Sequence, residues 1–351
     1  MYYHPTVNNI LTTQPAEVDL HIHSTFSDGS WSPQRIGDYA QRNRIKAISI
    51  TDHNTIEGNE ELKRYFEKTK RRKSPEIING VEITTKLKDK KFHLLAYMYN
   101  NTAESKNILE KQFTKIRETA TKRKDKIIKN LQDLGFRIDV NKLNTDAYDD
   151  YLIGSIIVQN NMNIKQLENY GIRTKKEFLK EIDLKIKTYL KHRYNIKDLD
   201  QYFKKLKHID KKDRIDEPCE QFFKKFLKKG CEYYIPKDRI EFRSIKKGLK
   251  NTNALLVIAH PSSRYIGLDK DTLQDLINRG IDGIEGYSIS SNVNYRKWIE
   301  RFAKRNNLFL TGGTDFHNKN SPYIPGSYNP HNRLNYKIIK NMKRCWKNKY
   351  N

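Results

Sequence analysis

The sequence of 351 residues predicts an α/β fold built on a parallel sheet and interrupted by a mainly helical segment. Strand-like apolar runs alternate with helix-like runs over residues 1–102, the alternation stops in 103–250, and it resumes in 251–325. Polar residues follow the strand-like runs at their carboxyl ends. Loops at those ends hold ligands both in (β/α) barrels and in open doubly wound sheets, so the pattern alone leaves both architectures open.

The first third of the chain contains the clearest alternation. Its strands are expected over 18–23 (VDLHIH), 46–53 (KAISITDH), 75–85 (PEIINGVEITT) and 91–99 (KFHLLAYMY). A helix that opens at Ser32-Pro33 separates the first two strands, and a charged helix near 57–72 follows the second. We therefore expect residues 1–102 to form the first half of an α/β domain.

Residues 103–250 are expected to form a helical insertion. A long charged run in this segment ends at Gly135, which is a plausible helix C-cap. Further strands are expected over 254–260, 283–288 and 308–317, with helices near 270–279 and 293–305. Residues 251–325 would then complete the domain, and the basic segment 326–351 would form a terminal helix.

The chain is strongly basic, with 68 Lys and Arg against 42 Asp and Glu and a formal net charge of +26. Such a charge should concentrate anionic ligands such as nucleotides or RNA. An AT-rich genome, which favours Lys, Asn, Ile and Tyr codons, accounts for the composition equally well. The charge therefore names no partner by itself.

The cysteines and the apolar runs indicate a cellular setting. Cys219, Cys231 and Cys345 form no CxxC pair and are odd in number, which argues against a disulfide framework or a thiolate zinc site. No apolar run is long enough to cross a bilayer, and the first residues lack the regions of a signal peptide. We expect a soluble cytoplasmic protein with no membrane contact and no obligate protein partner.

Histidines gather at the ends of the expected strands. Six of the ten lie at or just past such an end: His21, His23, His53, His93, His260 and His317. Because side chains alternate along a strand, both imidazoles of His21-Ile22-His23 should point to one face and could bind the same metal ion. As an isolated motif this pair is a weak signal, since histidines also line polar barrel rims.

Carboxylates occupy matching positions. Asp28 lies in a Ser-Asp-Gly turn, Asp52 directly precedes His53, Glu82 lies in the third strand, and Asp315 alternates with His317. Apolar strand ends bury such groups reluctantly unless a cation compensates, so a metal site is favoured over a polar barrel mouth without metal. Mixed nitrogen and oxygen donors suit Mn, Zn, Fe or Co better than Mg. The number of donors predicts two or three divalent ions, with Glu82 as the bridge. We expect Mn, with Zn or Fe as alternatives.

Seven segments together resemble the PHP (polymerase and histidinol phosphatase) family: DLHIHSTFSDGS, AISITDHNTIEG, NGVEITT, FHLLAYMY, VIAHPSSRY, GIEGYS and LTGGTDFH. They occur in family order and cover about 19–100 and 215–320, whereas most of 140–210 looks specific to this chain. The similarity is greatest to the stand-alone branch, which includes nucleoside 3′,5′-bisphosphate phosphatases and 5′-to-3′ exoribonucleases acting on short RNA. The resemblance implies a distorted (β/α)₇ barrel, similar to a TIM barrel, with a trinuclear metal site.

The resemblance also implies a ligand set. One ion would be held by His21, His23, Glu82 and Asp315. A second would be held by Glu82, His93 and His260, and a third by Asp28, His53 and His317. Asp52 would support catalysis by orienting a ligand histidine. Asn54 stands where relatives usually have Asp, which bears on substrate choice.

The function implied is a metal-dependent phosphoesterase in which a metal-activated hydroxide attacks phosphorus in a nucleotide or at a short RNA 5′ end. Arg264 is the expected phosphate clamp, with Ser262 and Ser263 as lesser donors, although by spacing alone Arg264 could equally be a solvated surface residue. Basic helices of 103–250 could select the nucleotide, with Tyr233 or Tyr234 stacking on a base. The alternative is a solvated helical lid.

Two other functions remain open from the sequence. A small-molecule phosphomonoesterase acting on histidinol phosphate or a sugar phosphate would share the metal site. A non-catalytic nucleic-acid-binding module would require broken ligand motifs, and the motifs quoted above are intact.

Overall fold

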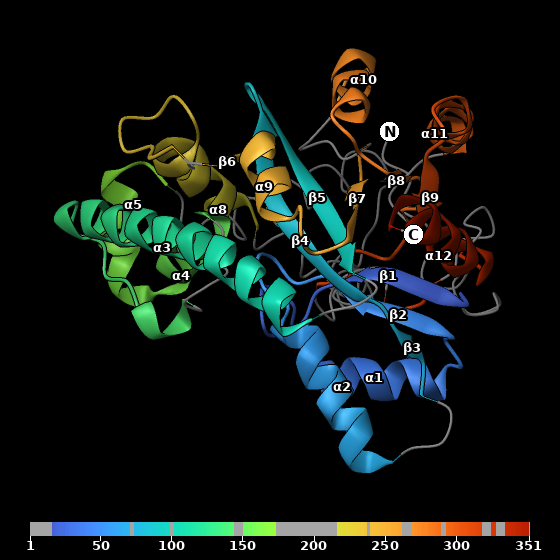
Figure 1. Ribbon diagram of the computed structural model, residues 1–351. Coiled ribbons are helices and arrows are strands. Elements are labelled where there is room, and N and C mark those ends of the chain that lie inside the picture. Colours follow the sequence, from blue (N-terminus) through green and yellow to red (C-terminus); the bar gives the residue numbers. More distant parts are fainter. Residues whose placement is uncertain are drawn as a thin grey trace, which may run out of the picture. The chain divides into compact units, whose positions relative to one another are not determined.

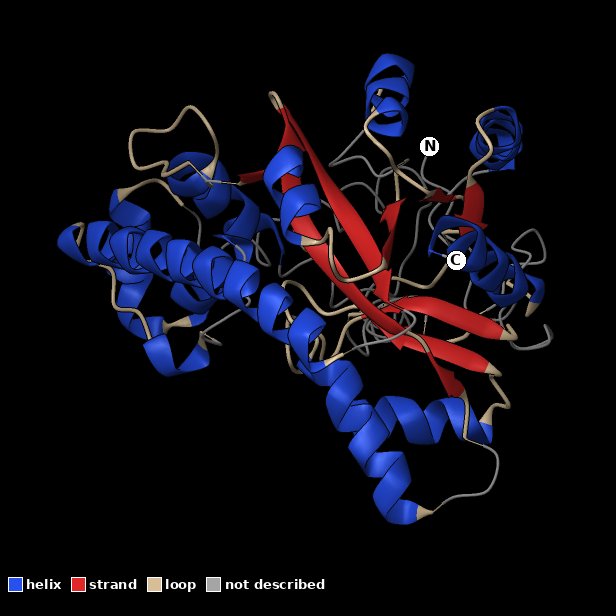
Figure 2. Cartoon of the chain, viewed as in Figure 1, coloured by secondary structure: helices blue, strands red, loops and turns tan. Residues whose placement is uncertain are grey.

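The computed structural model describes residues 16–70, 74–98, 102–143, 150–172, 216–236, 239–261, 268–288, 293–317, 324–327 and 334–350. The chain divides into two compact units. Residues 1–117 and 239–351 form the first, which we call the barrel unit, and residues 118–238 form the second, which we call the inserted unit. The described strands belong to the barrel unit, and the inserted unit is helical where it is described (Figures 1 and 2).

The barrel unit begins with two parallel β/α repeats. β1 (Val18–Ile22) pairs with β2 (Ala47–Ile50), which pairs with the short β3 (Glu76–Ile77). Helix α1 (Pro33–Arg42) begins as expected, with Ser32 accepting a hydrogen bond from the Arg35 N–H and with proline in its first turn. Helix α2 (Glu57–Thr69) follows β2.

The next two strands form a hairpin and correct the expectation of an all-parallel sheet. β4 (Asn79–Leu87) and β5 (Lys90–Met98) are antiparallel, and β5 is also antiparallel to β7 (Ala254–Ile258). Only Lys88 and Asp89 separate β4 from β5, which is far too short for the crossover that parallel strands need. His93 therefore does not lie at the carboxyl end of its strand.

The remaining strands follow the predicted order. β7, β8 (Gly283–Glu285) and β9 (Phe309–Thr311) are parallel, with α10 (Lys270–Asn278) and α11 (Val293–Arg305) between them. A two-residue strand that was not predicted, β6 (Ile240–Glu241), pairs in parallel with β4, and α9 (Phe242–Gly248) follows it directly.

Two bridges close the sheet into a barrel. Ile22 pairs with Phe316 beyond β9, and His53 beyond β2 pairs with Glu82 of β4. The circuit therefore runs β1-β2-β4-β5-β7-β8-β9 and back to β1, and the Asp315 N–H donates to the His21 carbonyl at 2.9 Å along the closing seam. The prediction of an α/β barrel is confirmed.

Apolar side chains fill the barrel from one end only. Leu20, Leu95, Tyr97 and Val257 belong to an inner cluster that the C-terminal helix α12 (Lys337–Tyr350) closes with buried apolar residues. On the outer face of the sheet, a larger cluster packs the strands against α9, α10, α11 and the first turns of α3 (Ala103–Asp133). The opposite end of the barrel interior carries the polar residues described below.

The inserted unit has its own apolar core. It contains the second half of α3, α4 (Asp150–Gln159), α5 (Ile164–Asn169) and α8 (Asp216–Phe222), and Phe136, Phe222 and Phe226 are buried together. Arg123 makes a two-pronged contact with the buried Asp150 at 2.6 and 2.9 Å. This unit lies within the segment 103–250 expected as the insertion. Residues 103–117 and 239–250 belong to the barrel unit.

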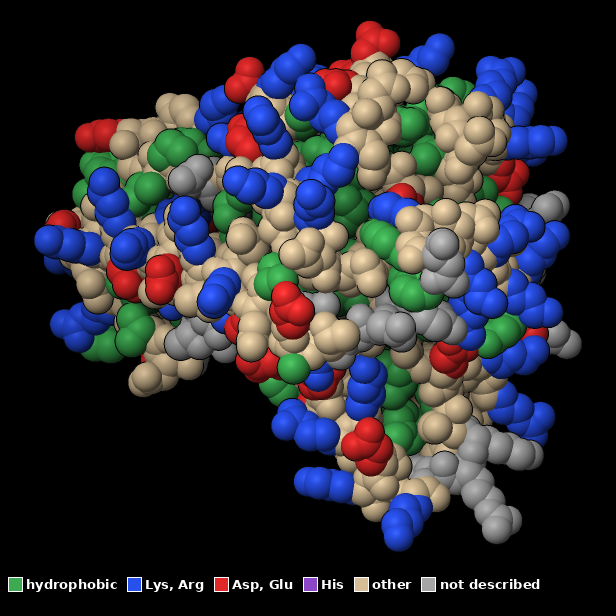
Figure 3. Space-filling view, in the orientation of Figure 1, with side chains coloured by type: hydrophobic (Ala, Val, Ile, Leu, Met, Phe, Trp, Pro, Cys, Tyr) green, Lys and Arg blue, Asp and Glu red, His purple; other side chains and the backbone are tan. Residues whose placement is uncertain are grey.

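The surface of the chain is rich in cations. Lys and Arg side chains are scattered over the face shown in Figure 3, with Asp and Glu between them, and do not gather into one patch. Among the described residues, no helix combines the length and apolarity needed to span a membrane.

Candidate metal centre

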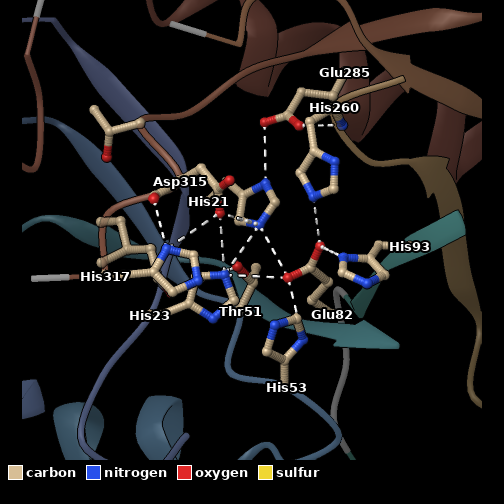
Figure 4. A network of polar contacts seen from close by, with 12 residues as sticks. His21, His23, Thr51, His53, Glu82, His93, His260, Glu285, Asp315 and His317 are labelled. Carbon is tan, nitrogen blue, oxygen red and sulfur yellow. Dashed lines mark hydrogen bonds and ion pairs between the residues drawn. The ribbon is translucent and has the colours of Figure 1, made fainter. Parts of the chain in front are cut away.

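All nine residues expected to bind metal converge at the polar end of the barrel unit. Figure 4 labels each of them except Asp28. Their donor atoms fall into three overlapping groups, within each of which the atoms lie within 4.8 Å of one another. The groups are His21, Glu82, His260 and Asp315; His53, Glu82 and His93; and His23, Asp28, His53 and His317. The nine residues are the predicted ones, but they are grouped differently: His260 lies with His21, His23 lies with Asp28, and His53 lies with both Asp28 and Glu82.

The strand alternation of β1 brings the first two histidines together. The Nε2 atoms of His21 and His23 lie 3.3 Å apart, and both side chains are fully buried. Each Nε2 also lies 3.3 Å from Asp315 Oδ1, and they lie 3.3 and 3.1 Å from Glu82 Oε2. Four donors from β1, β4 and the segment after β9 therefore face one point.

Glu82 lies at the middle of the whole set and is only 1% exposed. Its Oε1 lies 2.9 Å from His93 Nδ1 and 2.9 Å from His260 Nε2. Its Oε2 faces His21, His23 and His53. One carboxylate thus contacts imidazoles from all three groups, which is the geometry that a bridging ligand requires.

Because β5 runs antiparallel to its neighbours β4 and β7, the amino-terminal half of β5 lies toward the same rim as their carboxyl ends. His93 pairs with Thr84 of β4 and so comes into the centre from the opposite strand direction. The third group lies in the loops, where Asp28 Oδ2 is 3.7 Å from His53 Nε2 and 3.5 Å from His317 Nε2.

The pKa values of neighbouring histidines in this centre are shifted in opposite directions. Burial opposes protonation of His23, yet its contacts with Asp315 and Glu82 raise its pKa to about 10. Burial lowers the pKa of the neighbouring His53 to about 4 despite the charges of Glu82 and Asp28. Among the described residues, His53 Nδ1, His260 Nδ1 and Asp315 Oδ1 are buried without a hydrogen-bond partner.

Divalent metal ions would account both for the opposed pKa shifts of the histidines and for the buried donor atoms that lack hydrogen-bond partners. They would take the lone pairs of deprotonated imidazoles and balance the buried carboxylates without any proton being shared. The mixture of nitrogen and oxygen donors matches the ligands of transition-metal hydrolases, so the residues present fit such ions.

Asp52 supports the centre through a loop. Its carboxylate accepts hydrogen bonds from the Ser24 N–H (2.7 Å), the Ser24 hydroxyl (2.6 Å) and the Ser27 hydroxyl (2.6 Å). The Ser27 hydroxyl lies 3.5 Å from His23 Nδ1 and 3.3 Å from Asp28 Oδ1. The expected orienting role is therefore indirect, because Asp52 reaches two donor residues through Ser27.

Two buried carboxylates were not predicted. Glu285 lies 3.1 Å from His21 Nδ1 and accepts a hydrogen bond from the His260 N–H at 2.6 Å. Asp19 accepts from the Thr314 N–H, the Thr314 hydroxyl and the Gly326 N–H, which fastens the segment before Asp315 to β1. The sequence showed only that Glu285 falls inside the predicted strand 283–288, and it did not show that β8 ends at this residue.

Only some of the predicted substrate contacts lie among the described residues. Ser262, Ser263 and Arg264 lie outside the described residues. Tyr233 packs against Phe226 in the core of the inserted unit, with ring centroids 6.0 Å apart, and Tyr234 is half-buried.

Comparisons with known proteins agree with this geometry. The model of the PHP domain family matches residues 19–230, more than half of the chain. A 5′-3′ exoribonuclease of Haemophilus influenzae is 24% identical over 302 residues, covering 85% of this chain and 89% of the relative. A phosphoribosyl 1,2-cyclic phosphate 1,2-diphosphodiesterase of Eggerthella lenta is 21% identical over 312 residues, covering 86% and 94%.

Solved structures share the fold. A Bifidobacterium adolescentis protein assigned as a metal-dependent phosphoesterase superposes with a TM-score of 0.61 at 20% identity, covering 93% of this chain and 96% of that one. A Chromobacterium violaceum amidohydrolase with bound sulfate superposes with a TM-score of 0.60 at 18% identity, covering 93% and 97%. With the donor groups at the barrel rim, these findings show that the chain belongs to the PHP family and is a metal-dependent phosphoesterase.

Proposed function

We propose that the chain hydrolyses a phosphate ester of nucleotides or of the 5′ ends of short RNA. The observation that carries this proposal is the match to the H. influenzae 5′-3′ exoribonuclease, which extends over most of both chains and so includes more than the metal-binding motifs. The net charge of +26 supports it, because a positive field attracts polyanions.

The exposure of the donors indicates where the substrate enters. His21, His23 and Glu82 are buried, whereas Asp28 is 36%, Asp315 34% and His317 31% exposed at the side chain. The phosphate would therefore approach from the side of Asp28, Asp315 and His317. The apolar interior beneath His21 keeps water out from the opposite side.

The residues of the chain would act mainly by position. His21, His23 and Asp315 would bind one ion, Glu82 would link it to the ion near His93, and His317 would serve the third group. Bound divalent ions would supply Lewis-acid stabilisation of the phosphate oxygens and a nucleophile at neutral pH. We propose Mn as the metal, with Zn or Fe as the alternatives.

A second candidate is hydrolysis of a small cyclic or monoester phosphate. The match to the E. lenta cyclic phosphate diesterase favours it, since that match is also close to full length. Both substrates would use the same metal centre and would differ in what lies beyond the scissile phosphate.

The test is product release by the purified, Mn-loaded chain, with Zn- and Fe-loaded samples beside it. The substrates would be 5′-phosphorylated RNA oligomers, 3′-phosphoadenosine 5′-phosphate, a ribose cyclic phosphate and an aryl phosphate. A His21→Ala variant, which removes a buried donor, controls for contaminating nucleases.

Release confined to the RNA and the nucleotide, and lost in His21→Ala, supports the proposal. Activity confined to the cyclic or aryl phosphate would replace it with the second candidate. Wild-type protein that binds the oligomers without cleaving any substrate would favour the nucleic-acid-binding module instead.

A further inference from the structure

Two of the metal donors meet where β2 lies beside β4, a junction that we call the β2–β4 seam. β2 belongs to the three-stranded sheet β1-β2-β3, and β4 belongs to the six-stranded sheet. Beyond the end of β2, the Glu82 N–H donates to the Asp52 carbonyl at 3.2 Å, and the Asn54 N–H donates to the Glu82 carbonyl at 2.9 Å. At this bridge His53 Nδ1 lies 3.3 Å from Glu82 Oε2 (Figure 4). The distance between these two donors therefore depends on how the two strands are held together.

The side chain of Asn59, in the first turn of α2, joins the strands just before this bridge. Its Nδ2 donates to the Ile50 carbonyl of β2 and, at 2.8 Å, to the Gly80 carbonyl of β4. Its Oδ1 accepts from the Ile50 N–H at 3.1 Å. An asparagine amide has two N–H donors and a carbonyl acceptor, so one side chain matches all three backbone groups. Asn59 is 1% exposed and takes the place of a backbone rung between the strands.

The strands approach each other closely at this rung. A Cβ placed on Gly80 would lie 2.3 Å from Ser49 Oγ and 2.8 Å from Thr51 Cγ2, so β4 can lie here only without a side chain. Gly80 is two residues before Glu82, and Ile50 is three residues before His53. Asn59 therefore holds each strand directly ahead of the donor that it carries.

We propose that Asn59 is a positioning residue that holds Glu82 against His53 and so sets the affinity for the ion shared by His53, Glu82 and His93. Its hydrogen bonds go to backbone groups and not to a donor side chain, so it acts through the two strands. Removing the amide would leave buried backbone groups without partners, and relief of that cost would separate β4 from β2. The inference concerns the metal centre and holds whichever phosphate ester is the substrate.

The probe is Mn²⁺, titrated into the metal-free full chain. Asn59→Asp keeps the size of the side chain and its acceptor, but it sets a second oxygen against the carbonyls of Ile50 and Gly80. We expect the dissociation constant for Mn²⁺ to rise about tenfold or more, as for other residues that orient metal ligands. The added negative charge would by itself attract cations, so a loss of affinity has the opposite sign to the effect of charge.

Electron paramagnetic resonance separates positioning from a general loss of stability, because spin-coupled Mn²⁺ pairs and isolated Mn²⁺ ions give different spectra. Asn59→Asp should lose the coupled signal at a Mn²⁺ content at which the wild type shows it. Leu273→Ala, which opens a cavity between α10 and the sheet, should lower the melting temperature and leave affinity and coupling unchanged. Asn107→Asp, at an exposed position of α3, is the control for charge.

Weaker Mn²⁺ binding and loss of the coupled signal in folded Asn59→Asp support the assignment. Asn59→Ser, whose shorter side chain does not span both strands, provides the comparison if Asn59→Asp does not fold. Wild-type affinity and coupling in the folded Asn59 variants would overturn it, and so would equal losses in Leu273→Ala. Since the titration needs no turnover, it tests Asn59 even when no nucleotide or RNA proves to be a substrate.

Discussion

His21 is held from two directions. Its Nε2 faces Asp315 and Glu82 in the centre, while its Nδ1 faces the buried Glu285. The same carboxylate accepts a hydrogen bond from the backbone N–H of His260. Glu285 therefore fixes the ring orientation of one donor and the backbone position of another, a role in which outer carboxylates commonly strengthen metal binding.

Replacing Glu285 should weaken the metal centre without removing a donor. We expect Glu285→Ala to lower metal affinity about 10- to 100-fold. Titration of the metal-free protein with Mn²⁺ measures this change. Glu67→Ala, at an exposed glutamate of α2, is the control. Wild-type affinity in Glu285→Ala would show that His21 and His260 hold their positions without it.

The sequence was a better guide to the metal-donor residues than to the residues that hold those donors in place. The pair His21 and His23 was predictable because strand alternation alone puts both rings on one face. Glu285 and Asp19 carry no such signature, since a carboxylate that supports a histidine through space has no fixed spacing from it. The partners of Asp52 were likewise open, because a loop and not a strand presents Ser24 and Ser27 to it.

At the scale of elements, the sequence predicted which segments form strands but not the direction in which each strand runs. The apolar pattern located β5 correctly, but periodicity is the same for parallel and antiparallel strands, and only the short turn after Leu87 indicated the reversal. β6 was missed because two residues give no period at all. The reversal of β5 matters for the metal centre, since it brings His93 to the rim that holds the other donors.

The first turn of helix α2 lies close to the residues that support the metal centre. A Cβ placed on Gly58 would lie 2.1 Å from Asp52 Oδ2 and 2.9 Å from Ser24 Oγ. Asn59 fastens the same turn by donating to the Gly80 carbonyl at 2.8 Å. Helix α2 can therefore begin here only if its second residue has no side chain.

Gly58→Ala should consequently disturb both stability and metal binding. We expect a loss of about 1–3 kcal/mol in the free energy of unfolding, since the new methyl group displaces Asp52 from its serine partners. Denaturant unfolding and Mn²⁺ titration of the same sample measure the two effects. A variant as stable as the wild type would mean that α2 can move away at little cost.

At the scale of the whole molecule, the metal-free state should depend on pH in a characteristic way. The contacts that raise the pKa of His23 from 6.5 to about 10 stabilise the fold fully below pH 6.5. That stabilisation is lost as the pH rises through about 10, because the native state must then release a proton that the unfolded state has already lost. Metal binding has the opposite dependence, since it requires a neutral imidazole.

The free energy of unfolding of the metal-free protein should therefore fall between pH 7 and 9, by about 1.4 kcal/mol per pH unit for each proton of this kind. His23→Gln should flatten the slope. Denaturant unfolding in the presence of a chelator measures both proteins. Parallel curves for the two would assign the dependence to other groups.

The chain leaves the barrel unit after Arg117 and returns to it at Arg239. Arg117 donates to the backbone carbonyl of Asn54 at 3.0 Å, one residue from His53, and Arg239 directly precedes β6, which pairs with β4. Evolution could thus exchange or lengthen the intervening hundred or so residues while the two arginines kept their places. The barrel would retain its chemistry, and new substrates could be acquired by replacing one module between two fixed junctions.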